Sequence, residues 1–181
     1  MNLISSLVFI AVAVFYLLHE RAIFSKPNTE YSLVHVVKVY DGDTVGVFLD
    51  GGKEKVRLIG IDAPEMGQEP WGEEAKKHLD SLLSSSGWKV KMEYDVEKKD
   101  QYGRRLAYLW SADGKLINLQ MVRSGYALLY TVPPNVKHVS EFRAAQHEAR
   151  AERLGIWRAG GLKESPGDHR REHPWRPLYS R

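Results

Sequence analysis

The chain has 181 residues, which is enough to form one globular domain around an apolar core. It contains no cysteine, so disulfide bonds and thiolate metal sites are excluded. Lysine and arginine exceed aspartate and glutamate by 26 to 23, and the formal net charge of +3 is compatible with a polyanionic partner. Because any mildly basic protein surface has a similar excess, the charge alone assigns no function.

The first twenty residues differ in composition from the rest of the chain. Residues 3–18 are apolar apart from Ser5 and Ser6, and they carry no charge. A membrane-spanning helix needs about 20 apolar residues, with about 17 at the short end, so residues 1–20 are predicted to be a single-pass membrane anchor. The alternatives are a cleaved secretory signal, giving a secreted protein, and a buried or interfacial helix. A signal normally has basic residues before its apolar run, and this chain has none there.

Residues 21–32 read as a polar linker, and residues 33–158 carry the patterns of a folded domain. Strands are predicted at residues 33–40, 45–49, 55–61, 88–94 and 105–110, where β-branched or alternating apolar residues recur. Helices are predicted at residues 73–86, 116–124 and 141–153, the last with Ser140 as its N-cap. Strands and helices in this order, without strand–helix–strand alternation, predict an α+β fold or a barrel with helices.

Residues 159–181 form a basic tail, and its three prolines oppose long regular structure. The tail could bind nucleic acid or anionic lipid through its basic and aromatic residues. It could equally be a strap that packs Trp175 on the domain, and the sequence leaves both alternatives open. The residues concerned are Arg170, Arg171, His173, Trp175 and Arg176.

Three short segments gather charged residues next to predicted strands. They are Asp41-Gly-Asp43-Thr44, Arg57-Leu-Ile-Gly-Ile-Asp62-Ala-Pro-Glu65 and Asp100-Gln-Tyr102-Gly-Arg104. Carboxylates bind hard divalent cations through oxygen, and a further carboxylate can activate water. Arginines bind phosphate through two parallel hydrogen bonds and neutralise charge that develops in a transition state. The three segments together contain the groups that metal-assisted phosphodiester hydrolysis requires.

The order and wording of these segments resemble the staphylococcal nuclease (thermonuclease) family. The resemblance runs from about residue 33 to residue 157, and it includes Pro70-Trp-Gly-Glu-Glu-Ala75 and Leu154-Gly-Ile-Trp157. It implies an OB-type five-stranded β-barrel with three helices, here preceded by the N-terminal hydrophobic segment. Such barrels also serve as scaffolds for nucleic-acid binding.

The resemblance also implies a role for each matching residue. Asp43, Asp62 and the backbone carbonyl of Ala63 would bind Ca²⁺, and Asp41 would support the metal site from behind. Glu65 would be the general base, and Arg57 and Arg104 would bind the scissile phosphate. Two departures from the family pattern are Ala63 in place of threonine, which keeps the carbonyl, and Gln101 in place of lysine, which removes a phosphate contact.

Tyr102 and Tyr130 match tyrosines that line the family's nucleotide site, where aromatic rings stack on bases without regard to sequence. For Tyr130, core packing is an equally good interpretation, because stacking and core aromatics look alike in a sequence.

The expected activity is therefore that of a calcium-dependent nuclease. It would hydrolyse DNA and RNA with little sequence preference and leave 3′-phosphate products, and its catalytic domain would act as a monomer. The alternative is a catalytically weak nucleic-acid-binding or protein-binding module of the same fold. Such a module would be expected to lack some of the acids or arginines, and this chain retains all of them.

Overall fold

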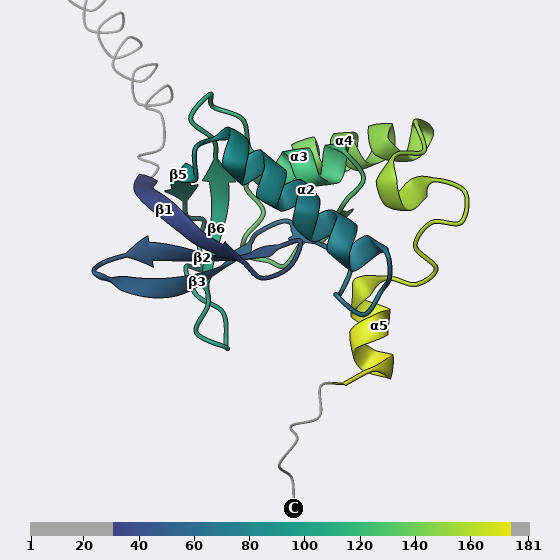
Figure 1. The fold of residues 1–181 in the computed structure, drawn as a ribbon, viewed down its shortest axis with the longest axis horizontal. Helices are drawn as coiled ribbons and strands as arrows, with labels where there is room; N and C mark the ends of the chain where they lie inside the picture. The colour runs from purple at the N-terminus through teal and green to yellow at the C-terminus, as the bar shows by residue number, and fades with distance from the viewer. Residues whose placement is uncertain (1–30, 175–181) are drawn as a thin grey trace, which may run out of the picture.

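The computed structural model describes residues 31–174, which form a five-stranded barrel with helices packed beside it (Figure 1). The barrel strands are β1 (Tyr31–Val39), β2 (Thr44–Leu49), β3 (Gly52–Leu58), β5 (Lys89–Glu93) and β6 (Arg105–Trp110). They follow the order β1-β2-β3-β6-β5, and β5 pairs with β1 to close the barrel. The α+β fold with an OB-type barrel is therefore confirmed.

The predicted anchor at residues 1–20 and most of the predicted linker lie outside the described residues. Within residues 31–174, no helix combines the length and the apolar character needed to span a bilayer. The domain begins slightly earlier than predicted, because Tyr31 and Ser32 already pair with Glu93 and Met92 of β5.

The barrel interior is filled by the β-branched and apolar residues that predicted the strands. On β1, Val34 and Val36 face inward while their neighbours are more exposed, as expected for a strand with one buried face. Because a β-barrel leaves no free strand edge, this inner layer is continuous around the sheet. The inward residues of the other strands are Val45, Val47, Val56, Leu58, Val90, Met92, Ala107 and Leu109, each almost fully buried.

The strand register brings three chain segments to one end of the barrel. Arg57, near the end of β3, lies opposite Thr44 at the start of β2 and opposite Leu106 near the start of β6. The β3–β6 pairing is parallel and staggered, so the last residues of β3 lie beside the first residues of β6. Asp43 directly precedes β2 and Arg104 directly precedes β6, so both lie at this end.

A second, two-stranded sheet extends the same region. It consists of β4 (Ile61–Asp62) and β7 (Leu128–Leu129), in which Asp62 pairs with Leu128. The next residue after β7, Tyr130, donates its backbone N–H to the carbonyl of Gly60 at 3.0 Å. Tyr130 is thereby brought beside the segment that carries Asp62.

The three predicted helices are confirmed, with ends that move by one or two residues. They are α2 (Trp71–Ser85), α3 (Ile117–Arg123) and α4 (Val139–Ala151), and the 3-10 helix η1 (Gly155–Trp157) follows. The predicted cap of α4 was wrong: the N-cap position is His138, with no capping side chain. Since the helix begins before Ser140, that hydroxyl lies in the first turn and donates to Glu141 Oε2 at 2.7 Å.

One helix was not predicted. Helix α5 (Pro166–Glu172) lies in the tail, apart from α2, α3 and α4, and a long loop joins it to α4 (Figure 1). Its local signal is ordinary: Ser165 is the N-cap and accepts the backbone N–H of Asp168 at 3.1 Å, and Pro166 occupies the first turn. A seven-residue helix is too short to be stable alone, so its contacts with the domain must hold it.

Candidate active site

The end of the barrel opens into a cleft of about 1070 Å³. Every predicted site residue lines it except Asp62, which lies buried beside it with 4% of its surface exposed. The structure therefore brings together all nine predicted residues, from segments up to 90 positions apart in the chain. The eight that line the cleft are Asp41, Asp43, Arg57, Ala63, Glu65, Tyr102, Arg104 and Tyr130.

Asp43 is held in place by hydrogen bonds from three directions. Its backbone N–H donates to Asp41 Oδ1 at 3.0 Å, so Asp41 shapes the turn that presents it. The Thr44 hydroxyl donates to Asp43 Oδ1 at 3.1 Å, and the backbone N–H of Ala63 donates to Asp43 Oδ2 at 2.9 Å. The carboxylate is thus buried and fixed between the start of β2 and the segment after β4.

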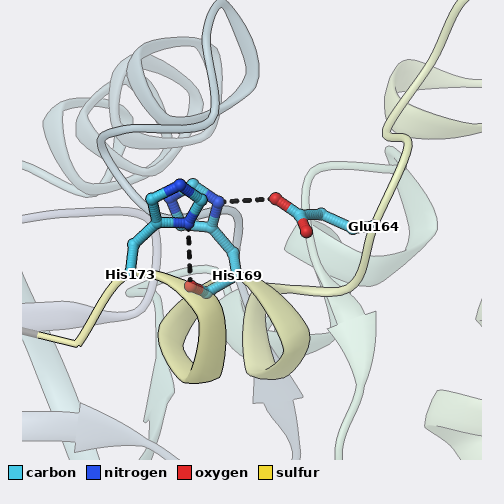
Figure 2. A group of neighbouring side chains, drawn as sticks. All are labelled: Glu164, His169 and His173. Carbon is cyan, nitrogen blue, oxygen red and sulfur yellow. Dashed lines mark hydrogen bonds and ion pairs between the residues drawn. The ribbon is translucent and has the colours of Figure 1, made fainter.

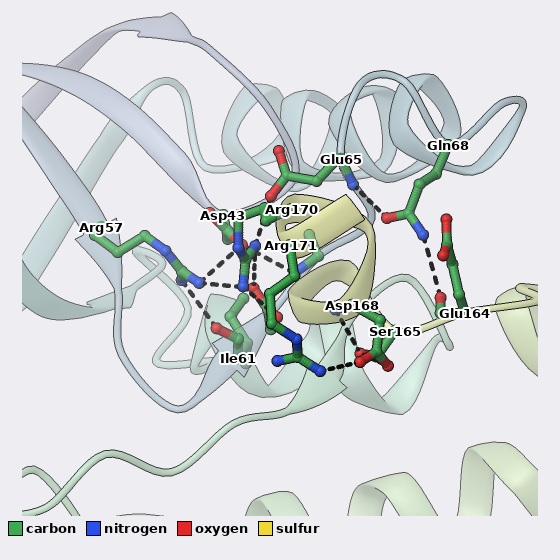
Figure 3. Close-up of polar contacts among 12 residues, drawn as sticks. Asp43, Arg57, Ile61, Glu65, Gln68, Glu164, Ser165, Asp168, Arg170 and Arg171 are labelled. Carbon is green, nitrogen blue, oxygen red and sulfur yellow. Dashed lines mark hydrogen bonds and ion pairs between the residues drawn. The ribbon is translucent and has the colours of Figure 1, made fainter. Parts of the chain in front are cut away.

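Arg57 connects the two buried acids. Its Nη2 lies 3.1 Å from Asp43 Oδ2 and 3.1 Å from Asp62 Oδ1. Its Nη1 donates to the backbone carbonyls of Leu58 and Ile61 at 2.7 and 2.9 Å (Figure 3). The resemblance implied that Arg57 binds the scissile phosphate, and in the structure its anionic partners are the protein's own aspartates.

The buried position of the Asp43 carboxyl disfavours its charged form. Its pKa is raised to about 7, chiefly by burial and also by the neighbouring Asp41 and Asp62, although Arg57 and the backbone N–H of Ala63 lower it. A buried carboxylate of this kind is stabilised by a nearby cation. All the acidic donors at this site are carboxylate oxygens, and no histidine from the described chain lines the cleft. Oxygen donors of this type fit calcium, which accepts six to eight oxygen ligands in flexible geometry.

A second positively charged side chain at the acidic site is that of Arg170 of α5, which sequence reasoning did not place here. Its Nη1 and Nη2 lie 3.1 and 2.9 Å from the two carboxylate oxygens of Asp62. Nη1 also lies 2.5 Å from Glu65 Oε1, and Figure 3 shows the side chain reaching from the helix into the acidic site. The bond between two groups 108 positions apart leaves no periodic signal in the sequence, so only the folded chain reveals it.

Gln68 is a second residue that the sequence did not single out. This buried side chain accepts the backbone N–H of Glu65 at 2.9 Å and donates to the carbonyl of Glu164 at 3.1 Å. It therefore fixes the backbone at Glu65 and ties it to the segment that precedes α5.

On the opposite wall of the cleft, Asp100 organises the loop that carries Tyr102 and Arg104. Asp100 Oδ1 accepts the backbone N–H groups of Tyr102 and Arg104 at 3.0 and 2.9 Å. Asp100 Oδ2 accepts Arg104 Nε at 2.7 Å, and the guanidinium carbon lies 5.5 Å from the centre of the Tyr102 ring. Asp100 was part of the sequence pattern, and its contacts explain why an acid is required there.

The two tyrosines are surface residues of the cleft. Tyr102 is 75% exposed and Tyr130 is 49% exposed. The interpretation of Tyr130 as a core residue is therefore wrong, and both rings are open to a ligand in the cleft.

An OB-type barrel that carries acids and arginines in a cleft at one end belongs to the nucleic-acid-processing class of this architecture. The family model for staphylococcal nuclease homologues matches residues 55–159. The chain is 37% identical over 159 residues to a protein named thermonuclease from Staphylococcus intermedius, covering 82% of this chain and 90% of that one. It is also 33% identical over 150 residues to endonuclease YncB of Bacillus subtilis, covering 79% and 70%. A thermonuclease from Staphylococcus hyicus is 34% identical over 135 residues, covering 72% and 78%. The chain belongs to the staphylococcal nuclease family.

The loop that carries Asp43 depends on the absence of a side chain at Gly42. A Cβ there would lie 2.6 Å from the Cβ of Ala63 and 2.8 Å from that of Ala75 on α2. We expect Gly42→Ala to lower the free energy of unfolding by about 1–3 kcal/mol, because the added methyl has no space. Urea unfolding measures this change.

Gly52→Ala is the matched control, since a Cβ at Gly52 meets only the Leu49 carbonyl at 4.0 Å. It should change stability by no more than about 0.5 kcal/mol. Equal effects of the two substitutions would show that close packing at Gly42 does not hold the loop.

Proposed function

We propose that the protein is a calcium-dependent nuclease that hydrolyses DNA and RNA with little sequence preference and leaves 3′-phosphate products. The observation that carries the proposal is the meeting of three acids and two arginines at one cleft: Asp43, Asp62, Glu65, Arg57 and Arg104. Family membership and relatives named thermonuclease and endonuclease support the same assignment. The size of the cleft and its two exposed tyrosines suit a polymeric substrate with aromatic bases.

Asp43, Asp62 and the backbone carbonyl of Ala63 would hold the calcium ion, with Asp41 supporting Asp43 through the hydrogen bond described above. The ion would supply positive charge next to the scissile phosphate. The acids by themselves repel a polyanion, so a cation at this position is needed before a phosphodiester can approach them.

The protein's own groups would perform the remaining steps. Water attacks phosphorus in line as the bond to the 5′ oxygen breaks, and Glu65 holds this water as base or orienting group. Arg57 and Arg104 approach the phosphate from two walls of the cleft and stabilise the charge that grows on its oxygens and on the leaving group. Tyr102 and Tyr130 offer faces on which bases can stack, which favours binding without sequence preference.

The metal requirement is tested by Asp43→Asn and by chelation. We expect Asp43→Asn to lower calcium affinity more than about 100-fold. Even the loss of a residue that only hydrogen-bonds a metal ligand lowers metal affinity by about 10–100-fold, and Asp43 is a proposed ligand itself. The fold should persist, since the asparagine oxygen can still accept the N–H of Ala63, and circular dichroism checks this. Asp80→Asn, on the exposed face of α2, is the control. Undiminished cleavage of DNA in excess chelator would refute the calcium requirement.

The arginine roles are tested by Arg57→Lys and Arg104→Lys. Lysine keeps the charge but loses the planar pair of donors. We expect each variant to lose about 10²–10³ in rate, mainly in kcat, as when a preorganised donor is removed. Steady-state cleavage at saturating calcium measures the loss. Arg123→Lys, on the exposed surface of α3, should be unaffected. A near-normal rate for Arg104→Lys would make Arg104 a structural residue.

Residues 1–20 are proposed to be an uncleaved single-pass membrane anchor, on the basis of the uncharged apolar run at residues 3–18. The full-length protein should then stay with membranes through an alkaline carbonate wash and keep its N-terminus. A soluble mature form with a new N-terminus between residues 21 and 30 would instead identify a cleaved signal.

A further inference from the structure

Arg170 makes the contacts that a bound cation would make at the acidic site. Both of its terminal nitrogens bond the Asp62 carboxylate, one to each oxygen, and Nη1 also bonds Glu65. Arg57 also bonds Asp62 Oδ1, so both oxygens of this carboxylate already accept hydrogen bonds from arginine side chains. Glu65, the proposed water-binding group, is likewise engaged through Oε1.

A guanidinium and a calcium ion cannot both occupy this position. Arg170 bonds both carboxylate oxygens of Asp62 and one of Glu65, whereas Arg57 bonds only Oδ1 of Asp62, so Arg170 takes the oxygens that a calcium ion would need. Arg170 is itself 43% exposed, so the side chain can leave toward solvent. Displacement moves α5 with its Arg170 side chain, and no core residue stands in the way because α5 buries only Pro166.

We propose that α5 is an autoinhibitory element in which Arg170 substitutes for the metal ion until calcium displaces it. This inference rests on the proposed function of the site. Calcium binding then requires that the Arg170 contacts break. The apparent affinity for calcium equals the affinity of the open site multiplied by the fraction of molecules in which the site is open. The device would keep Asp62 and Glu65 paired and the nuclease silent at low calcium.

The test compares calcium affinity in the full-length wild type and in Arg170→Ala by isothermal titration calorimetry. We expect the variant to bind calcium about tenfold more tightly, equivalent to about 1.4 kcal/mol, and to cleave DNA at lower calcium concentrations. Arg171→Ala is the matched control, because Arg171 lies next to Arg170 on α5 and forms its ion pair with Asp168, outside the acidic cleft. It should behave as the wild type.

A second measurement reports release of the helix. A glutamate-specific protease can cleave after Glu164, which precedes α5, and after Glu172, its last residue. If calcium releases the helix, cleavage there should accelerate on calcium addition in the wild type and be fast without calcium in Arg170→Ala.

The outcomes separate this inference from the proposed function. Equal calcium affinities in wild type and Arg170→Ala, or a protease pattern that ignores calcium, would overturn autoinhibition and leave the nuclease assignment intact. Loss of cleavage by Arg170→Ala at saturating calcium would make Arg170 part of the substrate-binding machinery and would also overturn it. Absence of calcium binding in both proteins would reject the calcium site, and autoinhibition would fall with it.

A separate observation on the same segment points to a second metal site of different chemistry. His169 of α5 and His173, the C-cap residue of this helix, are one turn apart, and their rings stack with centroids 4.3 Å apart (Figure 2). Glu164 joins them, with Oε1 2.6 Å from His169 Nδ1. One ligand atom from each of the three residues lies within 4.8 Å of the others. His173 Nδ1 contacts the carbonyl of His169, which leaves its Nε2 available.

We propose that Glu164, His169 and His173 bind a transition-metal ion such as Zn²⁺. Two imidazoles and one carboxylate are a donor set that suits zinc, with water in the fourth position. Ligand atoms around tetrahedral zinc lie about 3.3 Å apart, so the half-buried Glu164 and His169 and the exposed His173 need to draw together by up to about 1.5 Å. The site differs from the acidic cleft, where the proposed metal ligands are all oxygen atoms.

Zinc titration of the full-length protein without calcium, where Arg170 still fills the acidic cleft, tests this site, with a chromophoric chelator as competitor. We expect one zinc ion per chain at micromolar concentration or below, and at least tenfold weaker binding in His169→Ala and His173→Ala. His147→Ala, an exposed histidine of α4, is the control. If zinc binding is unchanged in the doubly substituted His169→Ala/His173→Ala protein, the site does not exist.

Discussion

The structure depends on two aspartates being buried next to each other at one end of the barrel. Asp43 and Asp62 are 7% and 4% exposed, and buried carboxylates are costly unless they are paired. Arg57 lies between them and hydrogen-bonds both the acids and the backbone around them, so one side chain stabilises the acids and shapes the loop between β3 and β4. The stability and the chemistry of this region therefore share the same contacts.

One guanidinium does not balance the charge of the acids at this site, because Arg57 faces the carboxylates of both Asp43 and Asp62. A further cation can come from solution or from the chain itself. In the structure it comes from Arg170, on a short helix that has little other packing against the domain. The shortage of positive charge that makes the cleft suitable for a divalent ion thus also makes it a docking site for the tail. Both proposals follow from the need to neutralise these carboxylates.

Much of the fold and most of the site were predictable because the relevant signals are local. Alternating apolar residues define each strand. The sequence Asp50-Gly51-Gly52 is typical of a hairpin turn, and it joins β2 to β3. The acids and arginines of the site belong to three short motifs whose wording resembles a known family. Tyr130 could not be assigned, because its exposure depends on the pairing of β7 with β4 rather than on its neighbours in the chain.

By itself, the sequence determined the strands, three of the helices and the set of acids and arginines, since these follow from periodicity and from motifs of a few residues. The family resemblance implied that the strands close into a barrel. Only the tertiary structure decided which charges pair. The register of β3 with β2 and β6 set Arg57 between the acids, and the return of the tail brought Arg170 to Asp62. Pairings between distant segments depend on the path of the chain through space, and no spacing along the sequence encodes that path.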